Sequence, residues 1–80
     1  MTLEILTPDK TVYEGEVNSV TVPGVQGSFE VLKGHAPIIS TLEDGKVTIR
    51  GVKGEDIFTI KGGVIEVINN KIMLLAEGIE

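Results

Sequence analysis

The chain has 80 residues and a mass of 8.6 kDa, which limits it to a single domain over residues 1–80 with a hydrophobic fraction of 41%, enough for a core. Its net charge of −5 and pI of about 4.7 oppose binding to nucleic acid or to an anionic lipid surface, because both need a positive field. It has no cysteine, no basic leader at Met1–Glu4 and no apolar run near the ~20 residues of a membrane helix, so we expect no disulfide, signal peptide or lipid insertion.

The first third of the chain predicts short strands between turns. Leu3–Leu6 alternates and ends at the turn residues Thr7–Lys10. A β-rich stretch follows at Thr11–Val17, interrupted at Glu14-Gly15. Ser19–Pro23 alternates cleanly, which places Val20 and Val22 on one face of a third strand.

The middle third contains the most distinctive segment. Phe29–Leu32 is a short apolar run between Gly27 and Gly34, and the only histidine follows it. Ile38–Thr41 predicts the next strand. Lys46–Arg50 then alternates strictly, so we expect Val47 and Ile49 to point inward.

The last third predicts a hairpin. Ile57–Ile60 is followed by a break at Gly62-Gly63 and then by two strands around Asn69-Asn70, a pair that suits a tight turn with positive φ. The run that ends at Glu80 is expected to leave the sheet without a terminal element. Because turn signals recur closely and no helical period occurs, the sequence predicts an all-β domain, an antiparallel sandwich or barrel of about nine short strands.

Catalytic and metal chemistry find little support. His35 has only Glu30 as a nearby acid, too few ligands for a metal site, and neither Ser28 nor Ser40 lies in a nucleophile motif. We therefore interpret His35 as a loop-fixing or interface residue. We expect no enzyme activity, cofactor, metal or small-molecule substrate.

The remaining candidate motifs also have plainer readings. The acidic pairs Glu43-Asp44 and Glu55-Asp56 lie in turns, where carboxylates are solvated. Gly24–Gly27 lacks the spacing of a nucleotide-binding loop, and a strand rather than a helix follows Gly62-Gly63.

One alternative function remains open. Lys46 and Lys71 both come just after predicted hairpin turns, as the modified lysine does in lipoyl and biotinyl carrier domains. Their contexts, Asp44-Gly45-Lys46 and Asn69-Asn70-Lys71, differ from the Asp-Lys-Ala and Met-Lys-Met of such carriers. Exposed lysines also protect sheet edges.

The segment Gly27–Pro37 resembles the Gly-x-Phe-Gly-Val-Leu-Pro-Gly-His-Ala-Pro signature of the ATP synthase epsilon subunit. Further motifs resemble that family in the same order along all 80 residues, and they are Leu3–Pro8, Gly15–Val17, Val20–Gly24, Leu42–Gly45, Ile60–Val67 and Leu74–Glu77. Glu30 and Lys33 stand where the signature has glycine and proline. The family's C-terminal helical hairpin is absent, by nature or by truncation, so the 80 residues alone should not inhibit ATP hydrolysis through it.

The resemblance implies a β-sandwich of about ten strands in the rotor of an F-type ATP synthase, without a catalytic role. It implies contacts with the gamma subunit at Thr7, Pro8, His35, Ala36 and Pro37. Contacts with the c-ring loops map onto Gln26, Gly27, Ser28, Phe29 and Glu30. The expected location is peripheral, on the cytoplasmic face of a bacterial inner membrane.

Overall fold

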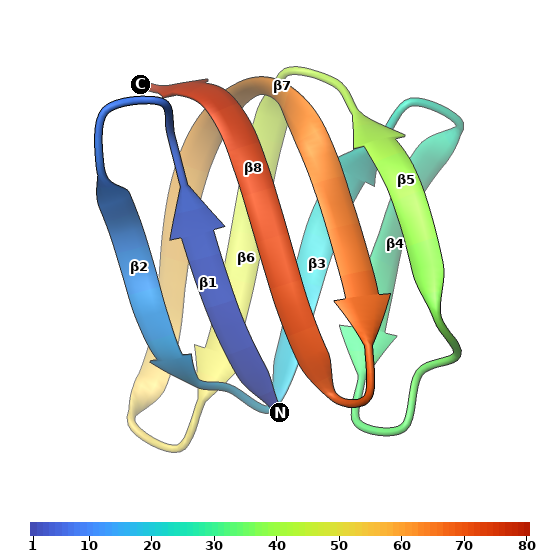
Figure 1. The fold of residues 1–80 in the computed structure, drawn as a ribbon. Helices are drawn as coiled ribbons and strands as arrows, with labels where there is room; N and C mark the ends of the chain where they lie inside the picture. The colour runs from blue at the N-terminus through green and yellow to red at the C-terminus, as the bar shows by residue number, and fades with distance from the viewer.

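A computed structural model describes all 80 residues, which form eight strands and no helix (Figure 1). The strands are β1 (Thr2–Leu6), β2 (Thr11–Glu16), β3 (Ser19–Gly24), β4 (Gly27–Leu32), β5 (Ile38–Leu42), β6 (Gly45–Gly51), β7 (Gly54–Ile68) and β8 (Lys71–Ile79). The structure thus has no helix long and apolar enough to cross a membrane. The predicted all-β class is confirmed.

The strands form two layers that β7 joins. Their hydrogen-bonded order is β2-β1-β8-β7-β5-β3-β4, with β6 paired to β3 and β7. The first half of β7 pairs with β6 and its second half pairs with β5, so one layer holds β2, β1, β8, late β7 and β5 and the other holds early β7, β6, β3 and β4 (Figure 1). All pairs are antiparallel except β1–β8, which is parallel.

The continuity of β7 explains why there are eight strands rather than nine or ten. The sequence predicted a break at Gly62-Gly63, but Gly63 stays in the ladder, opposite Ala76 on one side and Leu42 on the other. Both glycines have positive φ, 52° and 142°, so the strand bends between the layers without ending. A Cβ atom on Gly63 would overlap the carbonyl oxygen of Leu75, and therefore only glycine fits this bend.

Two other boundaries correct the sequence analysis. β2 runs unbroken through Gly15, which pairs with Leu3. The chain end does not leave the sheet, because β8 continues until Ile79 pairs with Ile60. By contrast, the predicted Asn69-Asn70 turn is confirmed, with φ of 50° and 60°.

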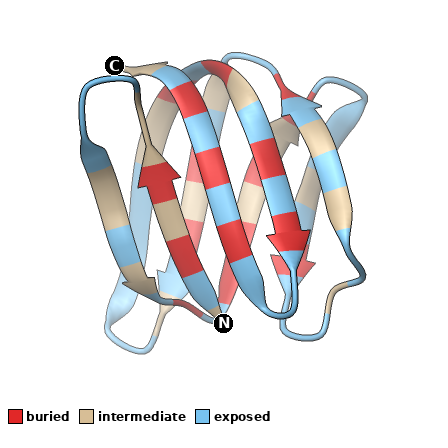
Figure 2. Cartoon of the chain, in the orientation of Figure 1, coloured by how far each residue is buried: buried red, intermediate tan, exposed pale blue.

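The core lies between the layers and consists of the inward residues of every second strand position (Figure 2). Val20, Val22, Val47 and Ile49 are almost completely buried, as their alternation predicted. Because a small sandwich has few buried residues, each strand must keep its register to hold this core together. The core consists of fifteen buried residues, which are Leu3, Ile5, Val17, Val20, Val22, Val31, Leu42, Val47, Ile49, Ile60, Ile65, Val67, Ile72, Leu74 and Ala76.

Candidate functional site

The signature segment forms β4 and the loop that connects it to β5. The loop turns at Gly34, whose φ is 83°. The backbone N–H of His35 donates to the carbonyl oxygen of Leu32 at 3.0 Å. The ring nitrogen Nδ1 of His35 lies 2.7 Å from the carbonyl oxygen of Ala36, and because a carbonyl only accepts, Nδ1 carries the proton. The half-buried histidine thus fixes its own loop.

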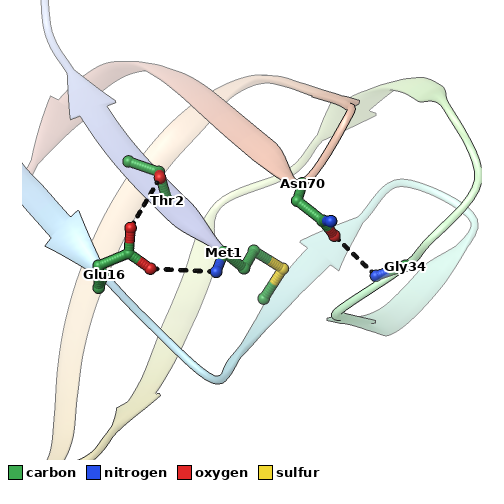
Figure 3. A network of polar contacts seen from close by, with 5 residues as sticks. All are labelled: Met1, Thr2, Glu16, Gly34 and Asn70. Carbon is green, nitrogen blue, oxygen red and sulfur yellow. Dashed lines mark hydrogen bonds and ion pairs between the residues drawn. The ribbon is translucent and has the colours of Figure 1, made fainter.

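Asn70 anchors this loop from the opposite hairpin. Its side-chain oxygen Oδ1 accepts a hydrogen bond from the N–H of Gly34 at 2.7 Å (Figure 3). Its carbonyl oxygen accepts another from the N–H of Thr2 at 3.0 Å. The sequence predicted only a turn at Asn70, because a single sequence carries no signal that two residues 36 positions apart form a hydrogen bond.

A second polar contact in Figure 3 closes the start of the chain. The terminal ammonium of Met1 and the hydroxyl of Thr2 each donate to the carboxylate of Glu16, both at 3.1 Å. These hydrogen bonds, with the positive charge of the terminus, lower the pKa of Glu16 below its usual 4.5. Since Glu16 is exposed, the pair is screened by solvent and contributes little to stability.

The residues predicted to contact the gamma subunit fall at opposite ends of the sandwich. Thr7 and Pro8 lie in the β1–β2 connection, at the end where the C-terminus lies, whereas His35–Pro37 lie at the other end (Figure 1). Thr7 is held in place because its N–H donates to the carbonyl oxygen of Lys10 at 2.9 Å. The structure therefore does not join the two groups into one loop cluster.

Both groups border the same exposed surface, the outer side of β1, β8, late β7 and β5, which we call the apolar face. Its exposed apolar residues are Ile39, Val64, Ile68, Met73 and Leu75, of which Ile39 is 71% exposed, and the half-buried Leu6 lies beside them. A groove of about 620 Å³ at one end is lined by Thr7 and Pro8 together with Leu6, Val64 and Leu75. A hollow of about 430 Å³ at the other end is lined by Pro37, Ile39 and Ile68. The predicted gamma contacts thus mark the two ends of one surface.

Four of the five predicted c-ring contacts lie together. A groove of about 580 Å³ between β4 and β5 is lined by Gly24–Phe29 and Ile38–Thr41. The facing sides of these two strands have no long ladder between them, because β4 pairs only with β3, and β5 pairs with β7 and touches β3 at one position. Gln26–Phe29 therefore sit on one wall of an open groove.

Glu30 lies apart from the other four. It points to the outer side of the second layer, where its Oε2 is 3.4 Å from Nη1 of Arg50. Arg50 also binds Glu55, with 3.1 Å between Nε and Oε2, and donates to the hydroxyl of Thr21 at 3.5 Å. The departure from the signature at Glu30 is therefore matched by a local positive partner, which the sequence did not reveal.

The other candidate groups stay scattered. No three His, Asp or Glu side chains gather as potential metal ligands. Lys46 pairs with Thr59 inside the β6–β7 ladder and Lys71 pairs with Ile68, so neither lysine lies at the tip of a hairpin. The remaining departure from the signature, Lys33, is exposed and is the first residue of the β4–β5 loop.

Comparison with known proteins supplies the context. Residues 1–80 match the family described as ATP synthase, Delta/Epsilon chain, beta-sandwich domain. The ATP synthase epsilon chains of Chlorobaculum tepidum and Chlorobium limicola are 51% and 47% identical to this chain, covering 95% and 96% of it and 88% and 89% of themselves. Those relatives thus have little sequence beyond the shared domain.

A solved structure shares the fold. A chain of the Euglena gracilis mitochondrial ATP synthase, described as OSCP/F1/c-ring in rotational state 1, superposes with a TM-score of 0.90. The match covers 98% of this chain and 51% of that one, at 21% identity. At that identity the likeness establishes the fold, and this chain spans about half of that larger chain.

Proposed function

We propose a function from one premise, that the chain belongs to the ATP synthase delta/epsilon chain family, whose β-sandwich domain its 80 residues form. The domain is a non-catalytic part of the central stalk, the rotor of a proton-translocating F-type ATP synthase. It docks on the gamma subunit and on the c-ring, and so couples rotation of the ring to ATP synthesis. No cofactor or small-molecule substrate enters this role.

The observation that carries the gamma-subunit contact is the apolar face. A monomeric domain rarely exposes so many apolar side chains on one sheet unless a partner covers them. The two longer dimensions of the molecule are each 26 Å, so the face offers on the order of 700 Å², close to the ~800 Å² per partner of a stable interface. Docking there brings Thr7 and Pro8 at one end and His35, Ala36 and Pro37 at the other against the same partner.

The c-ring contact uses the groove between β4 and β5. Gln26, Gly27, Ser28 and Phe29 line it, and the positive φ of Gly27, 126°, shapes the tight turn between β3 and β4. The groove exposes backbone hydrogen-bonding groups to a short polar loop. Glu30 does not line the groove, because Arg50 holds it on the other side of β4, so it affects the c-ring contact only through the position of β4.

A domain that makes these proposed contacts lies beside the membrane without entering it. As part of the F1 complex it is peripheral to the membrane that holds the c-ring. In a bacterium this is the cytoplasmic face of the inner membrane.

The decisive experiment is binding of the 80-residue chain to purified gamma subunit, measured by pull-down and by titration. We expect a complex at micromolar concentration, and no detectable complex would refute the proposal. His35→Ala should weaken the complex while the isolated chain keeps its melting temperature within a few degrees, because the side chain is half-exposed and its one hydrogen bond is to its own loop. A large loss of thermal stability would instead make His35 a purely structural residue.

A further inference from the structure

A row of glutamates crosses the middle of the apolar face and continues onto the neighbouring strand β2. Glu14 lies opposite Glu4 across the β1–β2 ladder, and Met73 lies opposite Glu4 on one side and Glu66 on the other. Each glutamate alternates with inward-facing residues along its strand, so all three point outward. The row crosses the face beyond the groove of Leu6 and Leu75, and its last member, Glu66, also lines the end hollow beside Pro37 and Ile39.

The fold does not use these carboxylates. The ion pairs of the structure involve Glu16, Glu30 and Glu55, and no side-chain hydrogen bond reaches Glu4, Glu14 or Glu66. Like charges placed directly opposite each other across a ladder, as Glu4 and Glu14 are, destabilise a sheet. Repulsion within the row therefore disfavours folding of the isolated domain. A binding partner outside the domain explains better why the row is present.

The three glutamates share a second hollow, which is not the one beside Pro37 and which has an apolar floor. We call this second one the hollow. It measures about 340 Å³, and its lining includes Glu4, Glu14, Glu66, Met73 and Ile68. Lys71 is also part of the lining but lies too far from every carboxylate to form an ion pair. Three acids and one base leave the hollow negative.

The hollow and the neighbouring groove lie at a fixed spacing. Glu4 and Leu6 are two residues apart on β1, and so are Met73 and Leu75 on β8, which places the two sites about 7 Å apart along the strands. A partner that covers the apolar face must meet both. A purely apolar partner would bury three unpaired charges, which is strongly unfavourable.

We infer that the gamma subunit inserts a lysine or arginine side chain into the hollow of Glu4, Glu14 and Glu66, about 7 Å from an apolar side chain that fills the groove of Leu6 and Leu75. The charged head reaches the carboxylates while its aliphatic stem packs on Met73 and Ile68. This inference rests on the proposed function. Beyond that function, it specifies that the partner presents a basic side chain at the hollow and an apolar side chain at the groove.

The test measures association of the full 80-residue chain with purified gamma subunit at 50 and 300 mM NaCl. Glu4→Gln with Glu66→Gln removes two charges from the hollow without adding bulk. Glu43→Gln with Asp44→Asn removes the same charge from the exposed β5–β6 connection, whose two residues line neither the hollow nor the groove. We expect the first pair to lower the association rate roughly tenfold at low salt and to flatten its salt dependence, whereas the control changes the rate less than twofold.

The outcomes separate the two claims. Equal effects of the two variants, or none from the hollow variant, would overturn the basic-side-chain inference while leaving the gamma complex in place. Failure of the unaltered chain to bind gamma subunit would overturn the proposed function, and this inference with it. Melting temperatures of both variants should match or exceed that of the parent, since no ion pair is lost.

Discussion

The hydrogen bond between Asn70 and Gly34 offers a test in which the control lies one residue away. Asn69 and Asn70 both have positive φ, 50° and 60°, so alanine at either position incurs a left-handed backbone penalty of about 1 kcal/mol. Only Asn70 makes a side-chain hydrogen bond. Since both partners are exposed and water can replace the bond, its loss adds about 0.5–1 kcal/mol.

Asn70→Ala should therefore lose about 1.5–2 kcal/mol and Asn69→Ala about 1 kcal/mol. At roughly 4–8 °C per kcal/mol for a domain of this size, the melting temperatures of the two variants should differ by about 2–8 °C in thermal unfolding followed by circular dichroism. Asn70→Asp keeps the acceptor oxygen and tolerates positive φ, so it should remain near the parent. Equal melting temperatures for the two alanine variants would show that the bond to Gly34 contributes nothing. Asn70→Ala should also weaken gamma-subunit binding more than Asn69→Ala, because it frees the His35 loop.

Further outcomes follow from the bend in β7, the Glu16 contact and the all-strand structure of the 80 residues. Gly63→Ala should destabilise the domain by about 3 kcal/mol or more in urea unfolding, because its Cβ meets the Leu75 carbonyl. Gly27→Ala, also at positive φ but in open space, should lose only about 1–2 kcal/mol, and similar losses in the two variants would contradict the steric argument. Because its folded-state pKa is lowered, Glu16 contributes stability above pH 4.5 that disappears as the pH falls through that lowered pKa. The urea midpoints of Glu16→Gln and the parent should accordingly differ by a small amount at neutral pH and converge in acid, and a difference that does not change with pH would refute this. Added to F1 particles, the 80-residue chain should leave the ATP hydrolysis rate unchanged, and suppression would disprove our expectation.

Sequence patterns predicted the parts of the fold that depend on near neighbours. Alternation identified Val20, Val22, Val47 and Ile49 as core residues, and paired asparagines identified the turn at residues 69–70. The sequence correctly marked Gly62-Gly63 as an irregular position. However, a glycine pair that ends a strand and a glycine pair that bends a continuous strand have the same sequence pattern. Only pairing to strands on both sides distinguishes a bent strand from two strands.

The candidate site depends on contacts between residues far apart in the sequence. Its arrangement could therefore be predicted less completely than the core residues and the turn. The Gly27–Pro37 segment indicated the family, yet its residues separate into a loop at one end, a groove at the other and the outward-facing Glu30. Asn70 and Arg50 come from distant strands and carry no local signal of their roles. The glutamate row emerges only when the register of four strands is known, because its members are spread over 63 positions from Glu4 to Glu66, counting both ends.

The single strand β7 also has a mechanical consequence. A rotor domain transmits torque, and a load applied to one layer must reach the other. One route for the load is the backbone of β7, which is hydrogen-bonded to β8 over its second half and to β6 and then β5 on its other side. A pull directed along β7 shears many of these bonds together instead of opening them one by one. The sandwich should therefore resist twisting as one stiff body, even though domains this small have modest equilibrium stability.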